Sequence, residues 1–270
     1  MMIKITFKGN NNWPKKKELK INLLCYPFTT TQTQQTYKEK VMRSLKVLSL
    51  FVFIFFFSIT LVSCSDDEEI VTPPVAKSKV LVTHASPDAP GVDLLVDNVV
   101  AGTNLVFPNS TGYLEVNSGT RNIKVNVTGT STTALEANLN LAQDKNYSVF
   151  AVNNVATIEA LVLEDNLTSP ASGKAHIRFI HLSPDAPAVD ITLTNGTVVF
   201  GDYIFKEASA FTPLDAGTYN LQVRLAGSST VVLDLPGIVL TTGKIYTVFA
   251  KGLVAGSGTQ ALGAQIIVNK

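Results

Sequence analysis

The chain has 270 residues, 46% of them apolar, which is enough to bury sizeable cores and suggests about two domains. Its net charge of +1 hides an asymmetry, because residues 1–64 hold ten basic and two acidic side chains and the remainder holds 12 basic and 19 acidic ones. The remainder is therefore mildly acidic, which argues against a nucleic-acid partner, since phosphate binding needs a clustered cationic face.

Residues 42–63 have the pattern of a secretory signal peptide. Met42-Arg-Ser-Leu-Lys46 is a short positive segment, and an uncharged run dominated by Phe, Leu, Ile and Val follows it. The run ends in Leu61-Val-Ser-Cys64, which resembles the lipobox of bacterial lipoproteins. This resemblance implies that Cys64 is lipidated and becomes the mature N-terminus. The alternative is a retained membrane-spanning helix, since the 17 residues from Val47 to Ser63 are at the short end of spanning length.

The segments on either side of this signal have different compositions. Residues 1–41 precede a second methionine, and our hypothesis is that translation starts at Met42 and that 1–41 is upstream sequence included in error; a long leader is the alternative. Residues 64–77 contain four consecutive acids and Pro73-Pro74, which predict an extended, solvated tether. The acidic run resembles the surface-export signal of some Gram-negative lipoproteins, although a plain spacer has the same composition. We expect a membrane-anchored protein of the cell envelope, in the outer membrane, with exposure at the cell surface left open.

A ten-residue motif occurs twice at a fixed spacing. His84-Ala-Ser-Pro-Asp-Ala-Pro-Gly-Val-Asp93 returns as His181-Leu-Ser-Pro-Asp-Ala-Pro-Ala-Val-Asp190, with eight identical positions and a displacement of 97 residues. A repeat period near a hundred residues indicates two whole domains. We therefore expect a first repeat at 78–165, a polar linker at 166–173 and a second repeat at 174–270.

Both repeats consist of short runs rich in β-branched and aromatic residues, divided by Gly, Pro, Asn and Asp. The clearest alternation of apolar and polar residues lies at 122–127 and 219–225. Seven strands per repeat, with regular turn signals, predict an all-β fold of two tandem antiparallel, immunoglobulin-like β-sandwiches. The predicted strands are 79–84, 92–96, 112–116, 121–127, 135–141, 147–152 and 158–163, then 175–182, 189–194, 208–214, 218–225, 230–235, 246–251 and 261–268.

The repeated motif, together with the strand before it, the later Gly-x-x-x-Leu/Ile-x-Val stretch and the elements Asp144-Lys-Asn-Tyr147 and Gly243-Lys-Ile-Tyr246, resembles the bacterial family called domain of unknown function 4397. The resemblance extends from about Lys79 to Lys270. It implies a secreted or surface location and a sandwich-like fold, and it supplies no catalytic residue. Tyr147 and Tyr246 enter late strands in a place that suits a tyrosine corner, in which the hydroxyl bonds a nearby backbone group.

The motif offers two interpretations of its polar side chains. His84, Asp88 and Asp93, with His181, Asp185 and Asp190, could supply nitrogen and carboxylate ligands to zinc or calcium. The interpretation that we favour assigns no metal and no cofactor: the carboxylates cap turn amides, and the histidines bond at strand ends.

We expect no enzymatic activity. Ser86, His84 and Asp88 could be read as a hydrolase triad, but no nucleophile elbow accompanies them. The favoured function is a non-catalytic binding or structural module whose loops recognise a glycan or an envelope protein. The alternative is an accessory glycan-binding lipoprotein of a polysaccharide uptake system. Exposed aromatic side chains would favour glycan stacking, and the candidates are Phe107, Tyr113, Tyr203 and Phe205.

Overall fold

The computed structural model describes residues 75–270, which belong to one compact unit. Sixteen β-strands provide nearly all of its regular structure, and the other elements in this range are short 3-10 turns at Val155–Thr157 and Gly258–Gln260. The expected all-β fold class is therefore confirmed. Within 75–270, no helix is long and apolar enough to span a bilayer.

Several sequence predictions concern residues outside this range. The upstream segment 1–41, the signal peptide 42–63, the lipidated Cys64 and most of the tether 64–77 all lie outside the described residues. They stay predictions.

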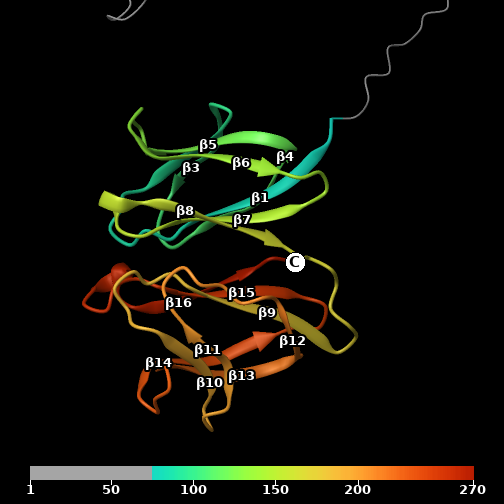
Figure 1. The fold of residues 1–270 in the computed structure, drawn as a ribbon, viewed down its shortest axis with the longest axis vertical. Coiled ribbons are helices and arrows are strands. Elements are labelled where there is room, and N and C mark those ends of the chain that lie inside the picture. Colours follow the sequence, from blue (N-terminus) through green and yellow to red (C-terminus); the bar gives the residue numbers. More distant parts are fainter. Residues whose placement is uncertain (1–74) are drawn as a thin grey trace, which may run out of the picture. The chain divides into compact units, whose positions relative to one another are not determined.

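In the first repeat, eight strands form two four-stranded sheets (Figure 1). One sheet has the order β4-β1-β7-β8 and the other has the order β3-β2-β5-β6. The strands are β1 (Lys77–His84), β2 (Val92–Val96), β3 (Val99–Leu105), β4 (Ser110–Asn117), β5 (Gly119–Val127), β6 (Thr133–Leu141), β7 (Asn146–Val152) and β8 (Glu159–Asp165).

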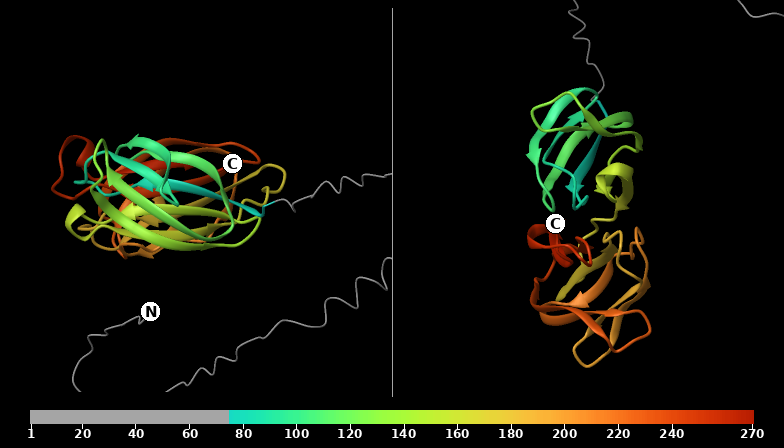
Figure 2. Two further views of the ribbon diagram at one scale, coloured as in Figure 1. Left: turned by 90° about the horizontal axis from the view of Figure 1, so that it is seen from above. Right: turned by 90° about the vertical axis from the view of Figure 1, so that its left-hand side faces the viewer.

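The second repeat has the same plan. Its sheets have the orders β12-β9-β15-β16 and β11-β10-β13-β14. Figure 2 shows the paired sheets of each sandwich from two further directions. The strands are β9 (Lys174–His181), β10 (Val189–Leu193), β11 (Val198–Tyr203), β12 (Thr212–Asp215), β13 (Gly217–Leu225), β14 (Val231–Leu240), β15 (Ile245–Lys251) and β16 (Gly263–Val268).

The sandwiches are mainly antiparallel, as expected, with one exception in each. β1 pairs with β7 in parallel, and β9 pairs with β15 in parallel, so one sheet of each sandwich is mixed. The remaining strand pairs are antiparallel. Periodicity along a strand does not reveal which neighbour it pairs with or in which direction, so the sequence did not show this exception.

The structure has one more strand per repeat than the sequence analysis predicted. The missed strands, β3 and β11, are the second strands of tight hairpins. β2 turns into β3 at Asp97-Asn98, where both residues have positive φ angles (50° and 65°), as a type I′ turn requires. β10 turns into β11 next to Asn195-Gly196, which is the strongest short hairpin signal in a sequence, so β11 was predictable.

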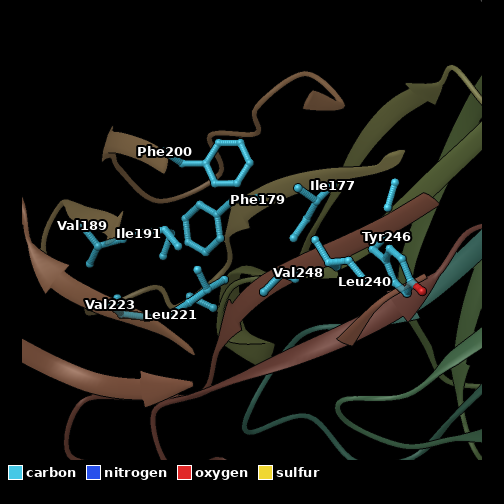
Figure 3. Close-up of a cluster of buried hydrophobic side chains, with 12 residues drawn as sticks. Ile177, Phe179, Val189, Ile191, Phe200, Leu221, Val223, Leu240, Tyr246 and Val248 are labelled. Carbon is cyan, nitrogen blue, oxygen red and sulfur yellow. The ribbon is translucent and has the colours of Figure 1, made fainter. Parts of the chain in front are cut away.

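Each repeat has its own hydrophobic core. The core of the first repeat is centred on Val80, Leu94, Ile123 and Val149, and all of its buried members come from that repeat. Figure 3 shows the corresponding core of the second repeat. There Phe179 stacks on Phe200 and meets Tyr203 edge to face, with ring centroids 6.3 Å and 5.6 Å apart.

A third cluster of buried side chains joins the two repeats. Phe150 of β7 and Phe249 of β15 meet edge to face at 6.0 Å, and Leu81 and Ile180 belong to the same cluster. The four strands β1, β7, β9 and β15 are consequently buried on both faces along most of their length. The repeats thus have separate cores and share a packed apolar interface.

Candidate functional site

The two motif histidines occupy equivalent positions. His84 and His181 are buried, and the Nε2 atom of each lies within hydrogen-bond distance of a carbonyl six residues later, at 2.9 Å from Pro90 O and 3.1 Å from Pro187 O. Each contact closes the proline-containing loop that follows β1 or β9. Burial lowers the pKa of both imidazoles, and the carbonyl contacts oppose that shift. Both rings are therefore held as structural groups at the ends of their strands.

The first aspartate of each motif caps a distant turn. Asp88 Oδ1 accepts the backbone N–H of Val155 at 2.7 Å, and Asp185 accepts that of Val254 at 3.0 and 3.1 Å. These amides lie in the loops that follow β7 and β15. The carboxylates thus tie the motif loop to the loop after the parallel partner strand.

The second aspartate of each motif binds two other backbone segments. Asp93 accepts the N–H groups of Asn104 at 2.9 Å and Gly129 at 3.2 Å. Asp190 accepts those of Asp202 at 2.7 Å and Gly227 at 2.9 Å. The amides of Asn104 and Gly129 hold the pKa of Asp93 below its usual value, because they stabilise the charged form. These four bonds position the hairpins at the ends of β3, β5, β11 and β13.

The structure does not bring the candidate ligands into a metal centre. Among residues 75–270, no group of three His, Cys, Asp or Glu side chains is close enough to hold a metal ion. Within the same described range, no hydrogen bond joins Ser86 to His84: Ser86 Oγ lies 3.5 Å from Asp88 Oδ1, and the His84 Nε2 atom contacts the Pro90 carbonyl. The hydrogen bonds of the motif carboxylates hold loops and hairpins in place.

The four aromatic candidates do not form an open stacking surface, since each is only partly exposed. Tyr203 packs in the second core, and Tyr113 and Phe205 pack against the cluster between the repeats. The Lys251 ammonium group lies 5.4 Å from the ring centre of Phe107. A glycan-stacking role for these side chains is therefore not supported by their placement.

The structure does contain a groove that the sequence analysis missed. It has a volume of about 550 Å³ and is formed by both repeats; we call it the inter-repeat groove. One wall comes from β3, β4 and the loop between them, and the other comes from β16. Its lining is uncharged and consists of Ala101, Gly102, Thr103, Asn104, Leu105, Val106, Pro108, Asn109, Ser110, Thr111, Leu114, Gln265, Ile266 and Ile267.

A second cavity, of about 490 Å³, lies at one end of the second sandwich. Its lining is mainly aliphatic and includes Pro187, Val223, Leu233 and Leu262, with His181 at one side. It is confined to one repeat. The inter-repeat groove differs from it because both repeats contribute polar side chains.

A buried polar network crosses the boundary between the repeats. Arg178 of β9 pairs with Asp165 of β8, and its Nη2 and Nε atoms donate to Ser148 and Thr247 at 2.9 and 2.8 Å. Burial lowers the pKa of the Arg178 guanidinium, and the Asp165 carboxylate opposes that shift. The network therefore pairs the buried guanidinium charge of Arg178 with the Asp165 carboxylate.

Tyr113 connects this network to the groove. Its hydroxyl donates to Asp165 and accepts from Asn269 Nδ2 at 3.1 Å. Burial, with the adjacent carboxylate, raises the pKa of the Tyr113 phenol, so the hydroxyl keeps the proton that it donates. Leu114, which follows Tyr113, and Ile267, two residues before Asn269, both line the groove. The bond thus holds the β4 wall and the end of the β16 wall together.

The sequence contained one signal for this shared face. Strands β7 and β15 read Asn-Tyr-Ser-Val-Phe-Ala-Val and Ile-Tyr-Thr-Val-Phe-Ala-Lys, which are nearly continuous apolar runs. Such runs are typical of strands buried on both faces. They could have predicted a covered outer face, although not the groove at its edge.

Comparisons with known proteins support the family resemblance over part of the chain. Residues 78–192 match the family model described as "Domain of unknown function (DUF4397)". No curated protein matches the chain. Among solved structures, the chain is similar to the crystal structure of CBMbc (family CBM26) from Eubacterium rectale Amy13K in complex with maltoheptaose. That similarity has 8% identity and a TM-score of 0.23, and it covers 70% of this chain and 96% of that one.

Proposed function

We propose that this chain is a lipid-anchored cell-envelope protein that acts as a non-catalytic binding module, with its ligand in the inter-repeat groove. The observation that carries the binding proposal is the groove itself. Its volume of about 550 Å³ lies within the range of ligand sites, roughly 300–1,000 Å³. Both repeats contribute to its walls, which gives the duplicated architecture a role in recognition.

The placement of the polar motif residues supports a non-catalytic role. His84, Asp88 and Asp93 bond backbone groups of their own repeat, and their second-repeat counterparts do the same. None of the six lines the inter-repeat groove. A hydrolase would need its acid, base or nucleophile within reach of a bound substrate.

A glycan-binding accessory role in polysaccharide uptake is the second candidate. The groove lining supports it, because the polar members carry neutral hydroxyl or amide groups that suit the hydroxyls of a neutral sugar. These members are Thr103, Asn104, Asn109, Ser110, Thr111 and Gln265.

A glycan array probed with the full chain in detergent tests both candidates. Binding to one glycan class, lost in Thr103→Arg and kept in Thr132→Arg, would support the glycan role. Thr103 lines the groove, whereas Thr132 is an exposed residue next to β6 and outside the groove lining. A Thr103→Arg variant that binds as well as the unaltered chain would contradict the assignment to the groove.

The membrane anchor needs its own experiment. Cells that express the chain and are fed radiolabelled palmitate should incorporate label into the unaltered protein and not into Cys64→Ala. Equal labelling of the two, or no labelling of either, would refute anchoring through Cys64.

A further inference from the structure

Strand β16 forms one edge of its sheet and pairs regularly along its length. Its single partner in the sheet is β15, with which it makes six consecutive pairs, from Lys251↔Gly263 to Tyr246↔Val268, without a register shift. An edge strand of this kind presents unpaired backbone N–H and C=O groups along its free side.

The other seven edge strands of residues 75–270 each have a feature that discourages pairing. Bulges or register shifts interrupt β3, β4, β6, β11 and β14, while Pro213 lies in β12. β8 is regular but carries Glu159, Glu164 and Asp165. β16, with the sequence Gly-Ala-Gln-Ile-Ile-Val, has no charge, no proline and no bulge. Proteins usually protect edges with such features, so an unprotected edge suggests a use.

The register identifies which backbone groups of β16 are free. The N–H of Asn269 donates to the carbonyl of Ile245 at 2.8 Å, so the backbone N–H of Asn269 faces β15; the N–H of Ile245 reaches the carbonyl of Lys270, at 3.3 Å. Hydrogen-bonded and non-hydrogen-bonded pairs alternate along an antiparallel ladder. The backbone groups of Ala264, Ile266 and Val268 therefore point away from β15. The side chains of Ile266 and Val268 are 37% and 58% exposed.

The free edge of β16 faces the inter-repeat groove. Three consecutive residues, Gln265, Ile266 and Ile267, line it. Side chains alternate between the two faces of a strand, so a run of consecutive residues lines a cavity only where the strand edge borders it. The opposite wall, 101–106 and 108–111, also consists of consecutive residues near the edges of β3 and β4.

We propose that the inter-repeat groove takes an extended, uncharged peptide segment of a partner protein, which pairs with β16 as an added strand. This inference rests on the proposed function, since it names the ligand class of the same groove. The free backbone groups recur at every second residue of β16, which is the spacing that an extended peptide matches. The uncharged lining gives no partner to a buried charge on the ligand.

The experiment uses the full chain in detergent and an acetylated, amidated peptide of alternating Thr and Val, six residues long. Backbone amide hydrogen exchange should slow at Ala264, Ile266 and Val268 when the peptide is present, and it should change little at Gln265 and Ile267, whose amides already face β15. A peptide N-methylated at alternate residues lacks the needed donors and should give no protection.

Matched variants test the strand-addition geometry. Ile266→Pro removes a free N–H that β15 does not use and should weaken peptide binding roughly five- to tenfold, as expected for the loss of one hydrogen bond. Ile266→Lys should weaken it similarly. Val198→Lys places the same charge at an exposed position of another edge strand, β11, and should bind like the unaltered chain. Thermal melting of each variant shows that it is folded.

The outcomes separate this inference from the proposed function. Protection by a neutral oligosaccharide together with no effect of the peptide would overturn the peptide assignment and leave a binding role for the groove. Protection of the same amides that grows with protein concentration, without peptide, would also overturn it, because the occupant would then be a second copy of this chain. No protection by either probe would overturn the inference and the groove-binding function together.

Discussion

Arg178 Nη1 lies 2.6 Å from Asp165 Oδ1 across the boundary between the repeats, and both side chains are buried. The strand registers show that this pair has no symmetric copy. Leu81 pairs with Ser148 as Arg178 pairs with Thr247, so Leu81 is the equivalent of Arg178. Tyr147 pairs with Glu164 as Tyr246 pairs with Val268. The residues that come next, Asp165 and Asn269, are therefore equivalent as well. At these equivalent positions, the arginine is therefore present only in the second repeat and the aspartate only in the first.

This asymmetry affects which faces can dock. Two copies of the first-repeat face would bury Asp165 opposite Leu81, and two copies of the second would bury Arg178 without a carboxylate. Burial of an unpaired charge is strongly unfavourable. The ion pair therefore favours docking of a first repeat with a second repeat over docking of two first repeats or of two second repeats.

The first prediction concerns removal of one member of this pair. Arg178→Leu leaves the Asp165 carboxylate buried without its cation and should lower the free energy of unfolding by about 3–5 kcal/mol. Urea unfolding followed by circular dichroism measures the change.

The double variant Arg178→Leu, Asp165→Asn is the control. It installs the residues found at the symmetric positions, Leu81 and Asn269, and should recover most of the loss because no charge stays buried. A double variant as unstable as the single one would refute the role assigned to charge pairing.

The second prediction concerns pH. Burial lowers the pKa of His84 and His181 below 6.5, while the Pro90 and Pro187 carbonyls, and Glu207 for His181, oppose the shift. The unfolded chain then binds more protons than the folded chain at pH values just below 6.5. Stability should consequently be constant above that pH and fall as the pH drops below it.

Melting temperatures between pH 5 and 8 test this dependence. The double variant His84→Asn, His181→Asn lacks both titrating rings and should show a flatter profile below pH 6.5. An identical slope in the two proteins would mean that other groups cause the dependence. The pKa values of Asp93 and Asp97 lie below 3.8, so these two groups change their charge below the pH range of the measurement.

The third prediction concerns the tyrosine corners. The hydroxyls of Tyr147 and Tyr246 accept the backbone N–H of Ala142 and Thr241, each five residues upstream and each at 3.1 Å. Tyr147→Phe and Tyr246→Phe should each cost about 1–3 kcal/mol, because a partly buried amide loses its acceptor. Tyr219→Phe removes a more exposed hydroxyl bond and should cost less in the same urea titration.

The fourth prediction concerns metal ions. The motif carboxylates accept backbone amides, and the motif histidines contact carbonyls. We expect the melting temperature to be unchanged by EDTA and by millimolar Ca²⁺ or Zn²⁺. A rise with either ion that is lost in Asp88→Asn would show that the motif binds the metal after all.

The Asp-Pro motif shows how far local sequence can predict a site. Pro87 and Pro90 prevent regular pairing, so His84 and Asp88 were predicted to bond nearby backbone groups. His84 does so at the Pro90 carbonyl, whereas Asp88 accepts the N–H of the distant Val155. The partner of Asp88 was not predictable, because Val155 is 67 residues away and reaches it only through the parallel pairing of β1 with β7. The inter-repeat groove was missed for the same reason, since its walls come from strands far apart in the chain.

Residue patterns alone predicted the duplication, the all-strand architecture and the tyrosine anchors, because these depend on side-chain alternation and turn chemistry within a few residues. Three properties depend on the tertiary structure: which strands lie at sheet edges, the burial of Arg178, and the position of the groove between the two repeats. These properties depend on which surfaces meet: the period of a strand shows that one face is covered, and only the packed chain shows what covers it.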